Sequence, residues 1–250
     1  ATDDLVKAVI CTHDLKEQDY INSHYVVMAT KKGVIKKTCL EQYSRPRQNG
    51  IVAITIKEDD ELLEARLTSG NSQVMLAVKS GKAIRFPEEK VRAVGRSGSG
   101  VRGISFDDEA NDEVIGMITI ENPKEETVLV VSENGYGKRT FIDDPETGEA
   151  VYRITNRGGK GVKTISVTEK TGNLVAIKSV LEEDDLMIIN KSGMAIRLPV
   201  SDLRVMGRAT QGVRLINIKG NDSIAAVAKV MKEDEQLPEG ENEELTPTDE

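Results

Sequence analysis

The sequence predicts an all-β fold, a propeller-like array of about four repeats with four strands each. Three observations predict it. An apolar run that ends in a glycine turn occurs four times, a glycine-rich basic block follows each turn, and each copy closes on another apolar run. Repetition of one unit along a chain is the signature of propellers and solenoids, in which neighbouring units cover each other's apolar faces.

Each unit is predicted to open with a β-hairpin. Its first strand is rich in Val, Leu, Ile and Met, and the glycine that follows tolerates the positive φ of a tight hairpin turn. Because this strand is apolar on both faces, it must be covered from both sides, as in sheets stacked around an axis. A two-sheet sandwich is the alternative all-β interpretation, but it does not explain so regular a unit. The four hairpin glycines are Gly33, Gly81, Gly135 and Gly193.

The basic blocks and closing strands complete the unit. The blocks occupy residues 47–54, 95–104, 156–165 and 207–216, and the closing strands 62–67, 114–120, 174–180 and 224–230. We therefore expect blades at about 20–68, 72–121, 126–180 and 184–232 within a domain of residues 1–232. Residues 5–10 resemble a closing strand, so residues 1–12 are expected to supply a strand of a preceding blade.

The charge is distributed unevenly. The formal net charge is −8, from 34 basic and 42 acidic residues. Nine of the acidic residues lie in 233–250, which has no basic residue, and without them 33 acidic residues face 34 basic ones. Its composition predicts a disordered acidic tail. No apolar run reaches the roughly 18–20 residues of a membrane helix, and no secretory leader opens the chain, so a cytoplasmic protein is expected.

The recurring basic residues indicate a nucleic-acid surface. If the units pack alike, equivalent positions stack into stripes, and a curved basic track binds duplex phosphates without reading sequence. The alternative is that these are ordinary solvated charges, but their recurrence at matched positions favours a ligand. The first stripe holds Lys37, Arg85, Arg139 and Arg197, the second Arg96, Arg157 and Arg208, and the third Arg102, Lys163 and Arg214; we also expect Arg45, Arg47, Lys138 and Lys160 to bind DNA.

Other features bear on the ligand. Acidic residues gather at 58–61, 107–109 and 182–185, in turns expected on the side opposite the basic track. Aromatic residues are only 3% of the chain and tryptophan is absent, which disfavours stacking of single-stranded bases. Duplex DNA is therefore the expected ligand.

No catalytic site is predicted. Residues 98–103 match G-x-G-x-x-G, but they lead into a strand-like segment rather than a helix, so a dinucleotide site is not expected. The acidic pairs lie in turns without a histidine or lysine partner, and we interpret them as solvated turns rather than a metal-dependent nuclease. We expect no catalytic residue, no metal ligand and no cofactor in this chain.

Three stretches resemble the later blades of the DNA gyrase A family. They are 133–140, 91–104 and 205–213, and the similarity extends over nearly the whole chain to about Val230. The resemblance implies a β-pinwheel, in which neighbouring blades exchange strands and a basic rim wraps DNA. It also implies a bacterial, nucleoid-associated protein whose partners are the rest of gyrase A and the separate gyrase B chain. ATP and Mg would serve that whole enzyme, a type II topoisomerase, in negative supercoiling, with the catalytic residues outside this chain.

The family's box, Q-R-R-G-G-K-G, has a partial counterpart here. Residues 157–161 keep R-G-G-K-G but lack the leading glutamine and one arginine. The resemblance implies that the true box, with the first two of six blades, lies outside this chain. Two alternatives stay open, the homologous domain of topoisomerase IV and a propeller that binds a protein partner.

Overall fold

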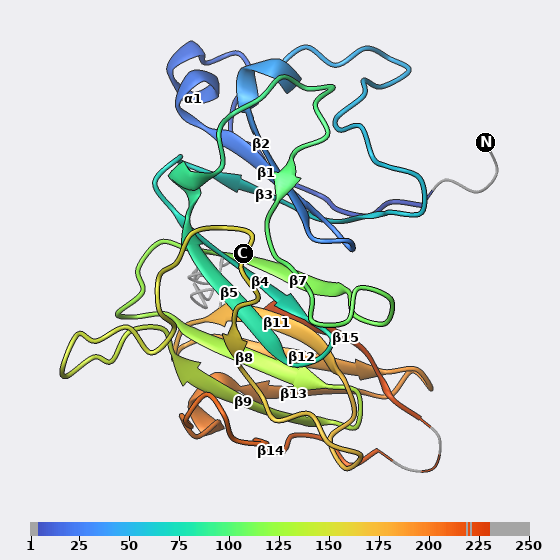
Figure 1. The fold of residues 1–250 in the computed structure, drawn as a ribbon, viewed down its shortest axis with the longest axis vertical. Helices are drawn as coiled ribbons and strands as arrows, with labels where there is room; N and C mark the ends of the chain where they lie inside the picture. Colours follow the sequence, from blue (N-terminus) through green and yellow to red (C-terminus); the bar gives the residue numbers. More distant parts are fainter. Residues whose placement is uncertain (1–4, 219, 221, 231–250) are drawn as a thin grey trace, which may run out of the picture.

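The computed structural model describes residues 5–218, 220 and 222–230, which form an almost entirely β structure. Four antiparallel sheets follow one another, the first apart from the other three (Figure 1). Unit 1 contains β1 (Tyr25–Thr30), β2 (Val34–Cys39) and β3 (Leu62–Thr68); unit 2 contains β4 (Gln73–Val78), β5 (Lys82–Pro87), β6 (Val101–Arg102) and β7 (Val114–Ile120). Unit 3 contains β8 (Thr127–Ser132), β9 (Tyr136–Phe141), β10 (Val162–Lys163) and β11 (Leu174–Val180); unit 4 contains β12 (Asp185–Asn190), β13 (Ala195–Pro199), β14 (Val213–Arg214) and β15 (Ile224–Val230). The expected all-β array is confirmed.

Helices are few and short. They are α1 (Gln18–Ser23) and the 3-10 turns η1 (Leu40–Tyr43), η2 (Glu88–Lys90) and η3 (Val200–Asp202). Each 3-10 turn directly follows the second strand of a hairpin, in units 1, 2 and 4. In unit 3 a loop beginning at Ile142 takes this place.

Neighbouring units exchange strands. The sheet orders are β3-β1-β2-β6, β10-β5-β4-β7 and β11-β8-β9-β14, so each short block strand joins the sheet of the preceding unit. The fourth sheet, β13-β12-β15, has three strands among the described residues. Strand exchange, which the family resemblance implied, is therefore present.

One glycine in each block makes this exchange possible. Gly100, Gly161 and Gly212 have φ values of +86°, +72° and +78°, which side-chain-bearing residues rarely adopt. An added Cβ would lie 2.5, 2.4 and 2.4 Å from the carbonyl oxygens of Ile35, Ala83 and Gly137, respectively, in the second strand of the preceding unit. Only glycine allows the block to come this close before its short strand pairs.

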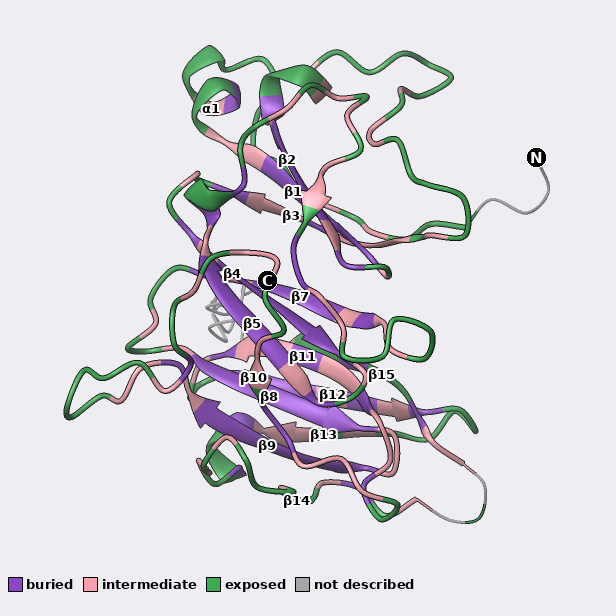
Figure 2. Cartoon of the chain, in the orientation of Figure 1, coloured by how far each residue is buried: buried purple, intermediate pink, exposed green. Residues whose placement is uncertain are grey.

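The apolar cores lie between the units. On β4, Val74, Leu76 and Val78 face a cluster shared with unit 1, whereas Met75 and Ala77 face a cluster shared with unit 3. On β8 the same alternation divides the side chains between the cores shared with units 2 and 4. The first strands are therefore covered on both sides, as expected from their two apolar faces, and Figure 2 shows β4 and β8 buried throughout their middle portions.

The N-terminal part covers the outer face of unit 1. Ile21 of α1 packs with Val26 and Met28 of β1, and Ala8 and Ile10 join this cluster. The described residues 5–12 belong to no strand, contrary to the expectation of a strand there. Leu5 and Val6 are exposed, because no described segment offers this stretch a strand to pair with.

The closing strands lie around a common axis. β3, β7, β11 and β15, together with residues 7–11, line one cavity of about 790 Å³. This places the closing strands inside and the hairpin ends and blocks toward the periphery, as in a propeller. The predicted acidic tail, residues 233–250, lies outside the described residues.

Candidate nucleic-acid interface

The glycine-rich blocks are joined to one another in series. The N–H of Thr55 donates to Gly98 O at 3.3 Å, that of Ser105 to Gly159 O at 3.0 Å and that of Ser166 to Thr210 O at 3.0 Å. These are the same positions in successive units. The blocks therefore form one continuous surface on which equivalent side chains are aligned.

The second stripe strengthens these joints. Each of its arginines donates a hydrogen bond to the main-chain carbonyl of one equivalent residue in the preceding block. The pairs are Arg96 to Val52 at 2.8 Å, Arg157 to Arg102 at 3.0 Å and Arg208 to Lys163 at 3.1 Å. All three arginines remain partly exposed, so each can still present N–H groups to an anion.

The third stripe lies beside the second and is more accessible. Arg102, Lys163 and Arg214 are all exposed. The guanidinium of Arg214 donates to the Tyr136 hydroxyl at 2.8 Å and lies 5.4 Å from the centre of its ring. That hydrogen bond lowers the pKa of Tyr136. We call the six residues of the second and third stripes the basic track.

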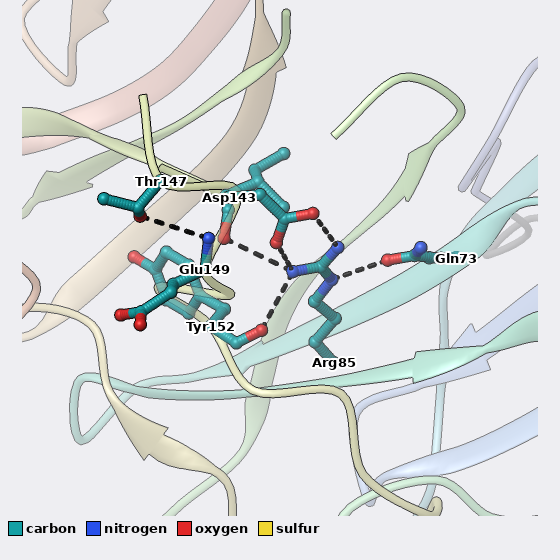
Figure 3. A network of polar contacts seen from close by, with 7 residues as sticks. Gln73, Arg85, Asp143, Thr147, Glu149 and Tyr152 are labelled. Carbon is teal, nitrogen blue, oxygen red and sulfur yellow. Dashed lines mark hydrogen bonds and ion pairs between the residues drawn. The ribbon is translucent and has the colours of Figure 1, made fainter. Parts of the chain in front are cut away.

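The first stripe is not on the surface, which corrects the expectation for three of its four residues. Arg85 is 1% exposed and is enclosed by unit 3 (Figure 3). Its guanidinium pairs with Asp143 at 2.5 Å and donates to the carbonyl of Tyr152 at 2.9 Å and to the side chain of Gln73 at 2.6 Å. A side chain with all these partners inside the fold is not available to phosphates.

The same arrangement joins the other units. Lys37 of β2 pairs with Glu88 of unit 2 at 2.8 Å, and both side chains are buried. Arg139 of β9 pairs with Glu182 and donates to the carbonyl of Leu203 in unit 4. Each of these residues links one unit to the next. Arg197 is exposed and pairs instead with Asp185 of its own unit at 2.7 Å.

Two further expected residues differ in their surroundings. Lys138 is 0% exposed, because its ammonium lies beneath the block of unit 4. It does not reach the surface, contrary to expectation. Lys160 is exposed but pairs with Asp107 at 2.9 Å, and hydrogen bonds from Lys82 and then Lys160 lower the pKa of Asp107. A ligand phosphate would compete with this carboxylate for Lys160.

The acidic turns also differ from the expectation. Asp107 lies beside the basic track rather than opposite it, through its pairs with Lys82 and Lys160. Asp184 and Asp185 are buried, not solvated. In the described part of the chain, no group of three or more His, Cys, Asp or Glu side chains could hold a metal ion.

Sequence reasoning missed a further set of exposed arginines. Arg92, Arg153 and Arg204 stand four residues before the second-stripe arginines, and all are exposed. Their recurrence at one position was the signal that could have identified them. Arg45 and Arg47 are also exposed, in the loop after η1 of unit 1, where no hydrogen bond within the described chain ties their side chains to the track.

The fold and the track together define a class, a β-pinwheel that carries a basic surface along its exchanged blocks. The family described as "DNA gyrase C-terminal domain, beta-propeller" matches residues 24–69, 73–121, 126–144, 147–180 and 184–231. The chain therefore belongs to the family of DNA gyrase C-terminal domains.

Individual relatives agree. The chain is 43% identical over 246 residues to the A subunit of DNA gyrase from Staphylococcus aureus (strain NCTC 8325 / PS 47), covering 98% of this chain but 26% of the relative. The chain thus spans about a quarter of the length of the curated relatives it matches. A DNA gyrase A C-terminal domain is similar in structure with a TM-score of 0.72 and 24% identity, covering 86% of this chain and 68% of that one. A topoisomerase IV C-terminal domain gives 0.76 and 22%, covering 86% and 64%. These structural likenesses show the fold.

No described helix has the length and apolar character needed to cross a membrane.

Proposed function

We propose that this chain binds duplex DNA along the basic track and serves as the DNA-wrapping part of a gyrase A protein. In the whole enzyme, with the rest of gyrase A and with gyrase B, it would support ATP-dependent negative supercoiling. Breakage of DNA and hydrolysis of ATP belong to other parts of that enzyme. The chain would then act in the bacterial cytoplasm, where the nucleoid is.

One observation carries the proposal: the basic track recurs on blocks that are bonded in series. Duplex DNA has phosphates at regular intervals, and a series of Lys and Arg side chains neutralises them and releases counterions. The guanidinium bonds from one block to the next fix the spacing of the series. Such contacts go to the backbone and carry no sequence information, which suits a protein that wraps DNA of any sequence.

The salt dependence of binding tests the proposal. Affinity for a labelled duplex should fall steeply with salt. The triple variant Arg102→Ala, Lys163→Ala, Arg214→Ala should lose about 2.7 from the log–log slope, at about 0.9 per phosphate contact.

A control variant separates the track from net charge. Lys16→Ala, Lys124→Ala, Lys229→Ala removes the same charge from exposed positions outside the blocks, and its slope should match the wild type. Equal slopes for the two triple variants, or duplex affinity that ignores salt, would refute the proposal and favour a protein-binding propeller. The identity to gyrase A relatives favours gyrase over topoisomerase IV.

A further inference from the structure

A buried lysine lies beneath two of the exposed blocks. The third residue after the hairpin glycine is Lys36 in unit 1, Ile84 in unit 2, Lys138 in unit 3 and Ile196 in unit 4. Lys36 is 1% exposed and Lys138 is 0% exposed. Neither ammonium has a carboxylate within ion-pair distance among the described residues.

Three block loops, residues 93–102, 154–163 and 205–214, each form an arch over the second strand of the preceding unit. One end of each arch is held by a parallel bridge, Lys37 to Ala93, Arg85 to Ile154 and Arg139 to Val205. The other end is held by the short exchanged strand. The residue under the arch is therefore Lys36, Ile84 or Lys138.

The two lysines bind the loops through main-chain carbonyls. Lys36 Nζ donates to the carbonyls of Arg96 and of Ala53, the latter at 2.6 Å. Lys138 Nζ donates to the carbonyls of Gly207 and of Arg208, the latter at 2.6 Å. Burial, and secondarily the charge of Arg96 or Arg208, lowers the pKa of each lysine to about 8.

Folding alone does not account for these lysines. A buried charge without a counter-ion is costly, and the equivalent Ile84 shows that an apolar side chain fills the position. An added Cβ on Gly159 would lie 3.4 Å from the Ile84 side chain, so the middle loop packs on it directly. The lysines must therefore do something for their loops that isoleucine does not do.

The carbonyl contacts determine which way the peptide groups face. In a planar trans peptide the C=O and the following N–H point in opposite directions. A carbonyl of Arg96 turned inward leaves the Ser97 N–H outward, and inward carbonyls of Gly207 and Arg208 leave the N–H groups of Arg208 and Ala209 outward. Within the described chain no acceptor takes any of these three N–H groups. Outward N–H groups beside an arginine form an anion site.

We propose that Lys36 and Lys138 are positioning residues that hold the first and third block loops with their carbonyls inward, so that main-chain N–H groups bind DNA phosphates together with Arg96 and Arg208. This inference rests on the proposed function, because the anion is a phosphate of the duplex. The middle loop lacks the lysine and binds through its side chains instead. Its Arg157 is held by two carbonyls, of Lys90 at 3.0 Å and of Arg102 at 3.0 Å.

Lys138→Ile and Lys36→Ile test this, since isoleucine is the residue that the other units carry. Each variant should weaken binding of a labelled duplex about tenfold, as expected for lost hydrogen bonds to a charged group. Its salt slope should change by less than that of Arg208→Ala, which removes a side chain that meets phosphate. Amide hydrogen exchange should show DNA protecting Arg208 and Ala209 in the wild type but not in Lys138→Ile, with protection of the middle loop unchanged.

Lys178→Ile is the control, a lysine half-buried on β11 far along the sheet from the blocks, whose pKa is also lowered by burial. Its duplex affinity should equal the wild type's. The inference is wrong if wild-type protein binds DNA while Lys36→Ile and Lys138→Ile bind within twofold of it and keep the amide protection. If the wild type does not bind duplex at all, the proposed function itself is wrong. Because Lys36 and Lys138 lie in different units, misfolding of one variant leaves the other to decide.

Discussion

Single residues of the same type have different roles at successive positions of this repeat. The fourth residue after the hairpin glycine is basic in every unit, yet in three units it is buried against an acidic residue or carbonyl of the following unit. The second-stripe arginines are partly exposed and also bridge units, but through carbonyl acceptors. The first set therefore stabilises the stacking of units, and the second can additionally meet a ligand.

Arg85→Ala should destabilise the protein. The substitution leaves Asp143 beside an emptied pocket and removes the partner of the Tyr152 carbonyl. Loss of one partner of a buried ion pair typically costs about 3–5 kcal/mol. Urea unfolding measures this cost, and Lys163→Ala, at an exposed position, should stay within about 0.5 kcal/mol of the wild type. A cost for Arg85→Ala as small as that would show that the pair does not hold the units together.

Stability should also depend on pH through the two buried lysines. Their folded pKa of about 8 lies below the ordinary value of 10.5, so between these values the unfolded chain binds more protons. The free energy of unfolding should therefore rise as pH increases from about 8 to about 10.5. Urea unfolding of the double variant Lys36→Ile, Lys138→Ile should show a smaller rise.

The tyrosines do not obscure this effect. Burial raises the pKa of Tyr43 and of Tyr152 above 10.0, so they lower stability only at higher pH, and they do so in both proteins. Parallel pH curves for the wild type and the double variant would contradict the prediction.

The sequence reveals which residues recur but not which way each one faces. Charged residues are almost never fully buried unless they are paired, so Arg85 and Lys138 were expected on the surface. Their partners are Asp143, nearly sixty positions on in the chain, and main-chain carbonyls of residues 207 and 208. No local pattern connects such distant groups. Exposure of the third stripe, in contrast, follows from short strands that present every second side chain outward.

At the level of elements, exchange of the short strands links the units. Each exchanged strand has two residues, too few to hold a sheet edge by its own hydrogen bonds. The preceding glycine, the bridge at the other end of the arch and the serial bonds between blocks hold it in place. The stability of the exchange therefore depends on close approach of backbones.

Gly161→Ala should separate β10 from β5. The new Cβ would lie 2.4 Å from the carbonyl oxygen of Ala83, at a residue with φ +72°. Gly148→Ala is a matched control, because Gly148 has the same φ of +72° with nothing within 4 Å. The control should cost about 1–2 kcal/mol from backbone strain alone, and Gly161→Ala should cost clearly more. Chemical unfolding measures both, and amide exchange at Val162 and Lys163 should be faster only in Gly161→Ala; equal costs would show that the close approach is unimportant.

Hairpins and closing strands could be predicted because their signals are local. Glycine turns between apolar runs marked the first two strands of every unit, and the burial of β4 and β8 on both faces followed from composition. The partner of each short strand could not be read from the units alone, because its two residues carry no signal for the sheet they join. Residues 5–12 resemble a closing strand, yet a strand also needs a neighbour to pair with.

For the whole molecule, wrapping requires the track to be continuous as well as charged. Duplex DNA is stiff over about 150 base pairs, so bending it around one small domain costs several kcal/mol. Scattered charges bind DNA without bending it, whereas blocks bonded in series offer phosphate contacts along a curved path. The serial bonds from Thr55, Ser105 and Ser166 provide that continuity.

Closing nicked plasmid in the presence of the protein measures wrapping directly. The wild type should change the linking number in one direction, and the triple variant of Arg102, Lys163 and Arg214 should lose most of the change along with its affinity. Gly161→Ala retains every charge but interrupts the series between units 2 and 3. Under conditions in which it stays folded, and at concentrations that saturate the DNA, it should bind plasmid yet shift the linking number less than Gly148→Ala does. A full shift by Gly161→Ala would mean that charge alone bends the duplex, and no shift by the wild type would mean that this chain binds DNA without wrapping it.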